Sequence, residues 1–204
     1  RLDGIECDQG FFQTHGWDKK TPKRAVENLG TDFLFPEIKY KFHACCHGLH
    51  SFLEALEELK QENNFNPESI EEIAIETNPS WLKVCNIQEP KTGLESKFSY
   101  KLTAAMSIYG KDTADLGTYN DDICFDDKMN NIRDKVKVIP NEQLTNTQSL
   151  ISIKDGSRDI KNKHDLSDKI DQNILETKIV NKSASLLSKN KSHEISKMLK
   201  APSE

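Results

Sequence analysis

The segment Lys39-Tyr-Lys-Phe-His-Ala-Cys-Cys-His-Gly-Leu-His50 lies where an extended run gives way to a helix. On its N-terminal side, apolar or aromatic residues alternate with basic ones: Ile38, Lys39, Tyr40, Lys41, Phe42 and His43. This two-residue period is that of a strand, with the rings on one face and the cationic groups on the other. Apolar residues then recur at helical spacing: Leu49, Phe52, Leu53, Leu56 and Leu59. We therefore expect a strand over 37–43 and an amphipathic helix over 47–61.

The stretch Cys45–Gly48 would lie at the N-terminus of this helix. Free backbone N–H groups and the positive end of the helix dipole meet there, and both favour an anion. Lys41, His47 and His50 would add basic side chains to the same place. The pattern indicates a carboxylate or phosphate site, with Lys41 as the cation and a histidine as acid or base.

The residue types alone leave three other interpretations open. Cys45, Cys46, His47 and His50 offer zinc-ligand atoms, but adjacent cysteines reach one tetrahedral ion with difficulty and no second ligand pair follows. Cys46 at a helix N-terminus would be a thiol nucleophile, although nothing else specifies a cysteine–histidine catalytic pair. The segment would equally suit a buried cysteine pair beside ordinary polar histidines.

The rest of the chain alternates strands and helices. Alternating apolar residues predict strands over 70–76, 136–139 and 149–154, and a turn at Asp155-Gly156 joins the last one to a second run through Ile160. Helical periods predict helices over 94–109 and 126–135, and a weakly amphipathic helical region over 170–199. This order predicts an α+β fold.

Composition restricts the class of protein. The net charge of the 204 residues is −5 and no basic arm stands out, which argues against nucleic acid as a partner. No apolar run approaches the roughly 20 residues of a membrane span, and the first residues lack a signal-peptide pattern. The five scattered cysteines include no C-x-x-C pair, which is typical of reduced thiols. We expect a cytoplasmic protein that binds neither membrane nor nucleic acid.

Two long motifs resemble one known family, MmgE/PrpD. Lys41-Phe-His-Ala-Cys-Cys-His-Gly-Leu-His50 resembles its Lys-Tyr-His-Ala-Ala-Cys-x-Gly-Thr-His stretch. Val84-Cys-Asn-Ile-Gln-Glu-Pro-Lys-Thr-Gly-Leu-Glu-Ser-Lys-Phe-Ser99 resembles its Val-Cys-Asn-Ile-x-x-Pro-x-Thr-Gly-Leu-Glu-Ala-Lys-Phe-Ser stretch. The order and separation of the motifs also fit, and two motifs in register are far more specific than one.

The resemblance implies a domain organisation. Proteins of this family have a large all-helical N-terminal domain and a smaller α+β C-terminal domain, and they commonly form homodimers without an iron–sulfur cluster. The likeness covers roughly residues 10–200 and only the C-terminal domain. We therefore expect residues 31–204 to be that α+β domain, residues 1–30 to lead in from the helical domain, and the helical domain itself to be missing. The resemblance implies no cofactor and no metal.

The resemblance also implies an activity. Family members include 2-methylcitrate dehydratase, cis-aconitate decarboxylase and iminodisuccinate epimerase, which act on small di- or tricarboxylates. We expect a hydro-lyase domain that removes a proton next to a carboxylate and releases water, and that is inactive without the helical domain. Decarboxylase-like or epimerase-like chemistry, and a non-catalytic remnant that binds a carboxylate or a partner, are the alternatives.

Site residues carry over position by position. Lys41 matches a lysine that lines the substrate cleft, and His50 matches the last histidine of the motif, so these two are the expected catalytic residues. Cys46 stands where the decarboxylase has a histidine. We expect Lys41, Cys46, His47 and Lys97 to bind substrate.

Overall fold

A computed structural model describes residues 7, 27–33, 35, 38–156 and 158–200, with the side chains of 199 and 200 excepted. The chain divides into two units, residues 1–39 and residues 40–204, and each is described by itself. In the first unit, the carbonyl of Asn28 accepts hydrogen bonds from the N–H groups of Thr31 and Asp32, both at 3.0 Å. The expected leading segment 1–30 falls almost entirely outside the described residues. All further description concerns residues 40–204.

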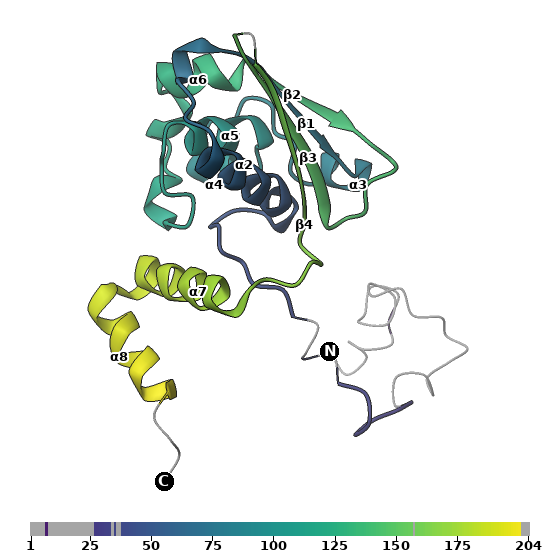
Figure 1. Cartoon of the computed structure of the whole chain (residues 1–204), viewed down its shortest axis with the longest axis vertical. Coiled ribbons are helices and arrows are strands. Elements are labelled where there is room, and N and C mark those ends of the chain that lie inside the picture. Colours follow the sequence, from purple (N-terminus) through teal and green to yellow (C-terminus); the bar gives the residue numbers. More distant parts are fainter. Residues whose placement is uncertain (1–6, 8–26, 34, 36–37, 157, 201–204) are drawn as a thin grey trace. The chain divides into compact units, whose positions relative to one another are not determined.

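A four-stranded mixed sheet forms the frame of this unit (Figure 1). Its strands are β1 (Ile70–Thr77), β2 (Val136–Pro140), β3 (Gln148–Asp155) and β4 (Arg158–Asp165), in the order β2-β1-β3-β4. β1 pairs with β2 in parallel and with β3 antiparallel, and β3 pairs with β4 antiparallel. The predicted strands 70–76, 136–139 and 149–154 and the hairpin at Asp155-Gly156 are confirmed.

The two faces of the sheet differ in polarity because successive side chains point to opposite faces. Ile73, Ile75, Ile151 and Ile153 are fully buried on the inner face. On the outer face, Glu72 forms ion pairs with lysines of the two neighbouring strands, Lys137 and Lys154. A core face and a solvated face are the usual arrangement of an antiparallel sheet.

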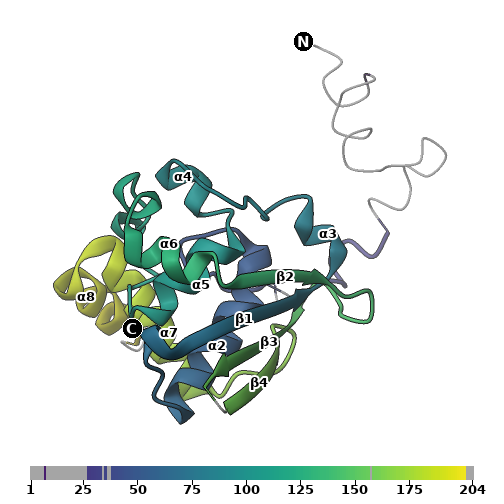
Figure 2. The same cartoon turned by 90° about the horizontal axis from the view of Figure 1, so that it is seen from above.

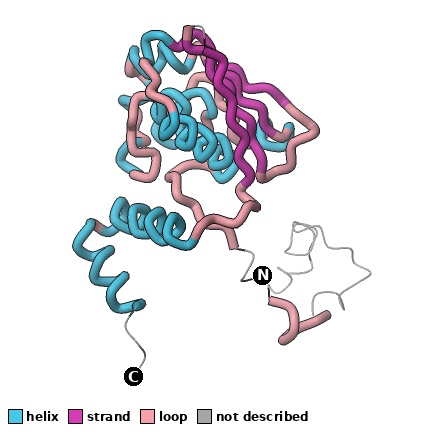
Figure 3. The backbone as a smooth tube through the Cα atoms, viewed as in Figure 1, coloured by secondary structure: helices cyan, strands magenta, loops and turns pink. Residues whose placement is uncertain are grey.

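Helices cover the inner face, as the two perpendicular views and the tube drawing show (Figures 1, 2 and 3). The helices of this layer are α2 (His50–Glu62), α4 (Gly93–Ser96), α5 (Tyr100–Ile108) and α6 (Asp127–Arg133). α2 packs on β3 and β4, and its predicted apolar residues are all buried: Leu49, Phe52, Leu53, Leu56 and Leu59. The predicted helices 47–61 and 126–135, and with them the α+β fold, are confirmed.

Shorter and outer elements complete the unit. The short ones are the 3-10 helices η3 (His47–Leu49), η4 (Pro67–Ser69), η5 (Leu116–Thr118) and η6 (Asp122–Cys124), and the helix α3 (Pro79–Leu82). The predicted helical region 170–199 is present as α7 (Gln172–Leu187) and α8 (Lys189–Lys200), separated by Ser188 with φ of +94°. Among the described residues, no helix combines the length and the apolar character that crossing a lipid bilayer requires.

The expected strand over 37–43 is wrong. Its described part, residues 38–43, has no regular secondary structure. A strand needs a neighbouring strand to satisfy its backbone groups, and this segment is not part of the sheet, whose order is β2-β1-β3-β4. The backbone N–H of Ala44 donates instead to the carbonyl of Thr113 at 2.8 Å. The alternation of residue types alone therefore did not make this segment a strand, because the segment pairs with no strand of the sheet.

The expected helix over 94–109 is interrupted. Ser99 has an extended backbone (φ −121°, ψ 110°) between α4 and α5, and its hydroxyl oxygen accepts a hydrogen bond from the N–H of Leu102 at 3.2 Å. A serine that caps a helix in this way starts a new one instead of continuing the old one. As a result, Leu94 leaves the predicted apolar stripe and is 69% exposed.

Candidate functional site

The segment that precedes α2 forms the start of a helix. The positive end of the helix dipole at this start is not offset by an acidic side chain. Cys46 is extended (φ −57°, ψ 141°), and the 3-10 turn η3 leads directly into α2. No side-chain cap is present at either start, and neither first turn contains an acidic residue. The positive end of the helix dipole is therefore not offset by a side chain and would favour an anion, although the N–H groups of Leu49 and His50 already donate to the carbonyls of Cys46 and His47.

The turn is held against the core by a buried tyrosine. The hydroxyl of Tyr100 donates a hydrogen bond to the carbonyl of Gly48 at 2.7 Å and is 3.1 Å from the hydroxyl of Thr77. A Cβ atom at position 48 would lie 2.5 Å from the Trp81 ring and 2.8 Å from Cys85 Sγ. Glycine is therefore required at this position by the close approach of these side chains.

Three histidines meet at this helix start. The ring centroids of His43 and His50 are 5.1 Å apart, and those of His47 and His50 are 5.3 Å apart. His50 is 1% exposed, and within the described residues its Nε2 has no hydrogen-bond partner. Burial, together with the nearby His43, His47 and Lys41, lowers the pKa of His50 from 6.5 to about 3. His50 is therefore a neutral imidazole at pH 7.

The structure brings together four of the five predicted site residues. Lys41 is exposed, and its charge acts on His50 and on Cys45. His47 and Cys46 are half-buried beside it. The arrangement is an exposed cation next to a buried neutral base and an uncapped helix start.

Lys97 joins the site through its backbone. Its carbonyl accepts a hydrogen bond from the N–H of Cys46 at 2.9 Å, which ties the second motif to the first. Its Nζ lies 5.8 Å from the centroid of the Tyr119 ring, a cation–π arrangement. Among the described residues, no hydrogen bond joins this side chain to Lys41 or His50.

Two thiols nearby, those of Cys45 and Cys85, are poorly suited to nucleophilic chemistry. Burial raises the pKa of Cys45 to about 12, and burial also raises the pKa of Cys85. Protonated thiols are weak nucleophiles and poor metal ligands. Within the described residues, Cys45, Cys46, His47 and His50 do not form a group with ligand atoms close enough to share a metal ion.

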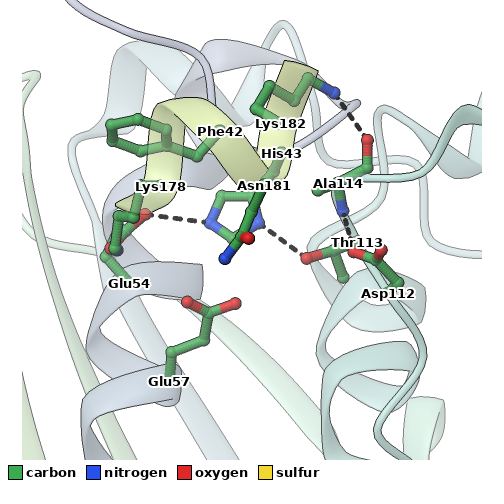
Figure 4. Close-up of a pocket in the computed structure, with 10 residues that line it drawn as sticks. All are labelled: Phe42, His43, Glu54, Glu57, Asp112, Thr113, Ala114, Lys178, Asn181 and Lys182. Atoms are coloured by element: carbon green, nitrogen blue, oxygen red, sulfur yellow. Dashed lines mark hydrogen bonds and ion pairs between the residues drawn. The ribbon is translucent and has the colours of Figure 1, made fainter. Parts of the chain in front are cut away.

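A pocket of about 160 Å³ lies next to this site (Figure 4). His43 Nδ1 is 2.7 Å from the hydroxyl of Thr113, and His43 Nε2 is 3.2 Å from Glu54 Oε1. Lys178 of α7 donates a hydrogen bond to the other oxygen of Glu54. Burial raises the pKa of Glu54, but His43 and Lys178 outweigh it and lower this pKa from 4.5 to about 2.

Sequence reasoning missed the pocket as a site. His43 lies in the histidine-rich segment before α2, and Glu54 lies among the apolar residues of α2, where a buried carboxylate is unusual. Those two features were the available signals. Thr113 and Lys178 come from distant parts of the sequence, and nothing local indicated where they would pack.

The fold and the site define an α+β domain with a basic, histidine-rich helix start. A family model described as "MmgE/PrpD C-terminal domain" matches residues 43–201. The chain therefore belongs to the MmgE/PrpD family, and the matched part is the C-terminal domain, as the two sequence motifs predicted. No curated protein matches the chain in sequence.

The low pKa of His50 predicts how stability depends on pH. The unfolded chain takes up a proton at this residue below about pH 6.5, whereas the folded chain does so only near pH 3. Protons therefore favour the unfolded state in that window, and the free energy of unfolding should fall as pH falls, by up to about 1.4 kcal/mol per pH unit. Urea unfolding between about pH 6.5 and 5 measures this slope above the range where most carboxylates titrate.

Two variants distinguish the contribution of His50 to this pH dependence from that of the other histidines. His50→Gln should flatten the slope, and His193→Gln, at an exposed position of α8, should leave it unchanged. Side-chain NMR of the unaltered chain provides the same test without a mutation, because His50 should remain neutral at about pH 5. A His50 that titrates near its ordinary pKa would contradict this description.

Proposed function

We propose that residues 31–204 are the C-terminal domain of a lyase that acts on a small di- or tricarboxylate, most closely in the manner of 2-methylcitrate dehydratase. The observation that carries this proposal is the convergence of Lys41, neutral His50 and an uncapped helix start in a chain of the MmgE/PrpD family. Residues 1–30 would lead in from the helical domain.

The chemistry of such substrates suits these residues. A proton is removed from the carbon next to a carboxylate, and negative charge then develops on the carboxylate oxygens. Lys41 and the positive end of the helix dipole supply positive charge where this charge develops. Loss of the β-hydroxyl, which leaves with a proton as water, completes the dehydration. Cys46, His47 and Lys97 would contact the remainder of the substrate.

His50 is the proposed proton acceptor. Its Nε2 lacks a partner in the described structure, and its imidazole is neutral at pH 7. A pKa of about 3 makes it a weak base in the free chain. A bound carboxylate would raise that pKa, because an opposite charge nearby favours the protonated imidazole. Substrate would thereby strengthen the base that acts on it.

Exposed apolar side chains support a second domain as partner. Leu94 of α4 and Phe125 beside η6 are 69% and 65% exposed. Their elements are in contact, with Cys124 Sγ 3.4 Å from the carbonyl of Thr92. Contiguous exposed apolar patches are typical of docking surfaces, whereas single exposed apolar residues are common. We assign this one to the helical domain, in a cytoplasmic homodimer whose lyase reaction uses no cofactor.

A second candidate function is carboxylate or partner binding without catalysis. It is favoured by the 1% exposure of His50, which prevents direct contact with a ligand unless the surroundings rearrange. It is also favoured by Cys46, which stands where the decarboxylase has a histidine. Within the family, decarboxylation and epimerisation share the first proton transfer and differ in the later step, which is loss of CO₂ or return of the proton to the opposite face.

A complementation assay separates these functions. The 204-residue chain alone should not dehydrate 2-methylcitrate, because part of the site would come from the helical domain. Adding a helical domain from the family, as a fusion or a separate chain, should produce the dehydrated product. Full turnover by the chain alone would mean that the proposal is wrong to divide the active site between this chain and the helical domain. Citrate binding without turnover by the complemented protein would favour the non-catalytic function.

In the complemented enzyme, Lys41→Ala should lower kcat/KM by at least about tenfold. A charged hydrogen bond to a carboxylate contributes about 1.5–3 kcal/mol, which corresponds to this factor. Lys97→Ala is the comparison, and its effect should be smaller and mainly on stability, because its side chain lies over Tyr119. If Lys41→Ala kept its turnover and Lys97→Ala lost it, the second motif would matter more for the reaction than the first, contrary to this proposal.

A further inference from the structure

The pocket beside the helix start contains three side chains that face one another (Figure 4). One nitrogen of His43 and one oxygen each of Glu54 and Glu57 all lie within 4.8 Å of one another. His43 and Glu54 are 3% and 5% exposed, and Glu57 is half-buried. Mixed nitrogen and oxygen ligands at this separation suit a divalent transition metal.

The backbone fixes the relative positions of these groups. Glu54 and Glu57 are three residues apart on α2, so they project from the same face of one helix. His43 precedes that helix, and the N–H of the next residue, Ala44, is bonded to the carbonyl of Thr113. Ligands on a rigid, packed element keep their geometry better than ligands on a loose loop.

The ring of His43 is oriented by its second nitrogen. Nδ1 is 2.7 Å from the hydroxyl of Thr113, which is itself 4% exposed. This contact aims Nε2 at the two glutamates. Metal-binding histidines almost always have such a partner on the other ring nitrogen.

The carboxylate of Glu57 has no hydrogen-bond or ion-pair partner among the described residues. Figure 4 shows it pointing towards His43, and no hydrogen bond or ion pair joins it to the described residues. Burial lowers the pKa of Lys60, and the nearby charge of Glu57 partly offsets this effect. The Nζ of Lys60, however, donates its hydrogen bond to the carbonyl of Ser107. Two carboxylates this close repel each other unless a cation lies between them. Lys178 neutralises only Glu54.

We propose that His43, Glu54 and Glu57 bind a divalent transition metal ion, with Zn²⁺ as the preferred ion. His43 Nε2 and one oxygen of each glutamate are the three protein ligands, and water occupies the fourth position. Nε2 must be unprotonated to give its lone pair to the metal, so in the metal-bound form Nδ1 carries the ring proton and donates it to the hydroxyl of Thr113. The pocket of about 160 Å³ has room for the ion and its water.

Lys178 is the internal competitor for this site. Its ammonium group forms an ion pair with Glu54, and it lies 5.3 Å from the centroid of the Phe42 ring. A cation bound to Glu54 and Glu57 displaces this ammonium group, because both neutralise the same carboxylate. Removing the lysine charge should therefore strengthen metal binding.

Isothermal titration of the 204-residue chain with Zn²⁺ tests the proposal. Glu57→Gln should raise the Kd by about tenfold or more, and Thr113→Val should have a similar effect through the ring of His43. Lys178→Met should lower the Kd. Glu62→Gln at the exposed end of α2 and His193→Gln on α8 are the controls, and neither should change it.

Co²⁺ substitution identifies the ligand atoms. The absorption spectrum should lack a thiolate-to-metal charge-transfer band, since no cysteine belongs to the proposed ligand set. Such a band, or Zn²⁺ affinity unchanged in both Glu57→Gln and Thr113→Val, would overturn the proposal and indicate adventitious binding elsewhere. Circular dichroism of each variant establishes that the fold is retained, and Glu57→Gln, at a half-buried position, remains informative if Thr113→Val does not fold.

Discussion

The arrangement of the site depends on one buried hydroxyl group. Tyr100 is fully buried on α5, and its hydroxyl donates to the carbonyl of Gly48 while it contacts Thr77 of β1. Its ring packs against Phe52 of α2, with centroids 5.2 Å apart. Leaving a buried carbonyl without its partner costs about 1–3 kcal/mol. This contact therefore fixes the helix start relative to the sheet and to both central helices.

As a consequence, the helix start combines a neutral histidine with a charged lysine. The Tyr100 contact holds His50 in the core, where burial keeps its imidazole neutral, whereas Lys41 remains exposed with its charge in solvent. A cation and a neutral base in one place suit a carboxylate that must be both bound and deprotonated at the neighbouring carbon. The pocket around His43 has a mixed character, because Glu54, Glu57 and Asp112 line it together with two lysines.

The local spacing of apolar residues along the sequence predicted most of the fold. The spacing of Leu49, Phe52, Leu53, Leu56 and Leu59 indicated α2, and the alternation around Ile73 and Ile151 indicated the central strands. These patterns succeed because burial of one face decides them within a few residues. The same alternation failed over 37–43, because pairing depends on a neighbouring strand that no local pattern can supply.

The site was predicted in part for a similar reason. Lys41, Cys46, His47 and His50 are close together in the sequence, so their meeting at one helix start could be predicted from it. The pocket could not be predicted in this way. His43 and Thr113 are 70 residues apart, and Glu54 and Lys178 are 124 apart. Contacts at such separations depend on the packing of whole elements.

Amide NMR of the chain titrated with citrate tests the central claim, that the helix start before α2 binds carboxylates. A neutral polyol of similar size is the control, since it can form hydrogen bonds but carries no charge. The account predicts that citrate, but not the polyol, shifts the amides of residues 46–50 and of Lys41 most strongly. It also predicts that Lys41→Ala reduces these shifts. Citrate shifts confined to α7 and α8, or equal shifts with the polyol, would contradict it.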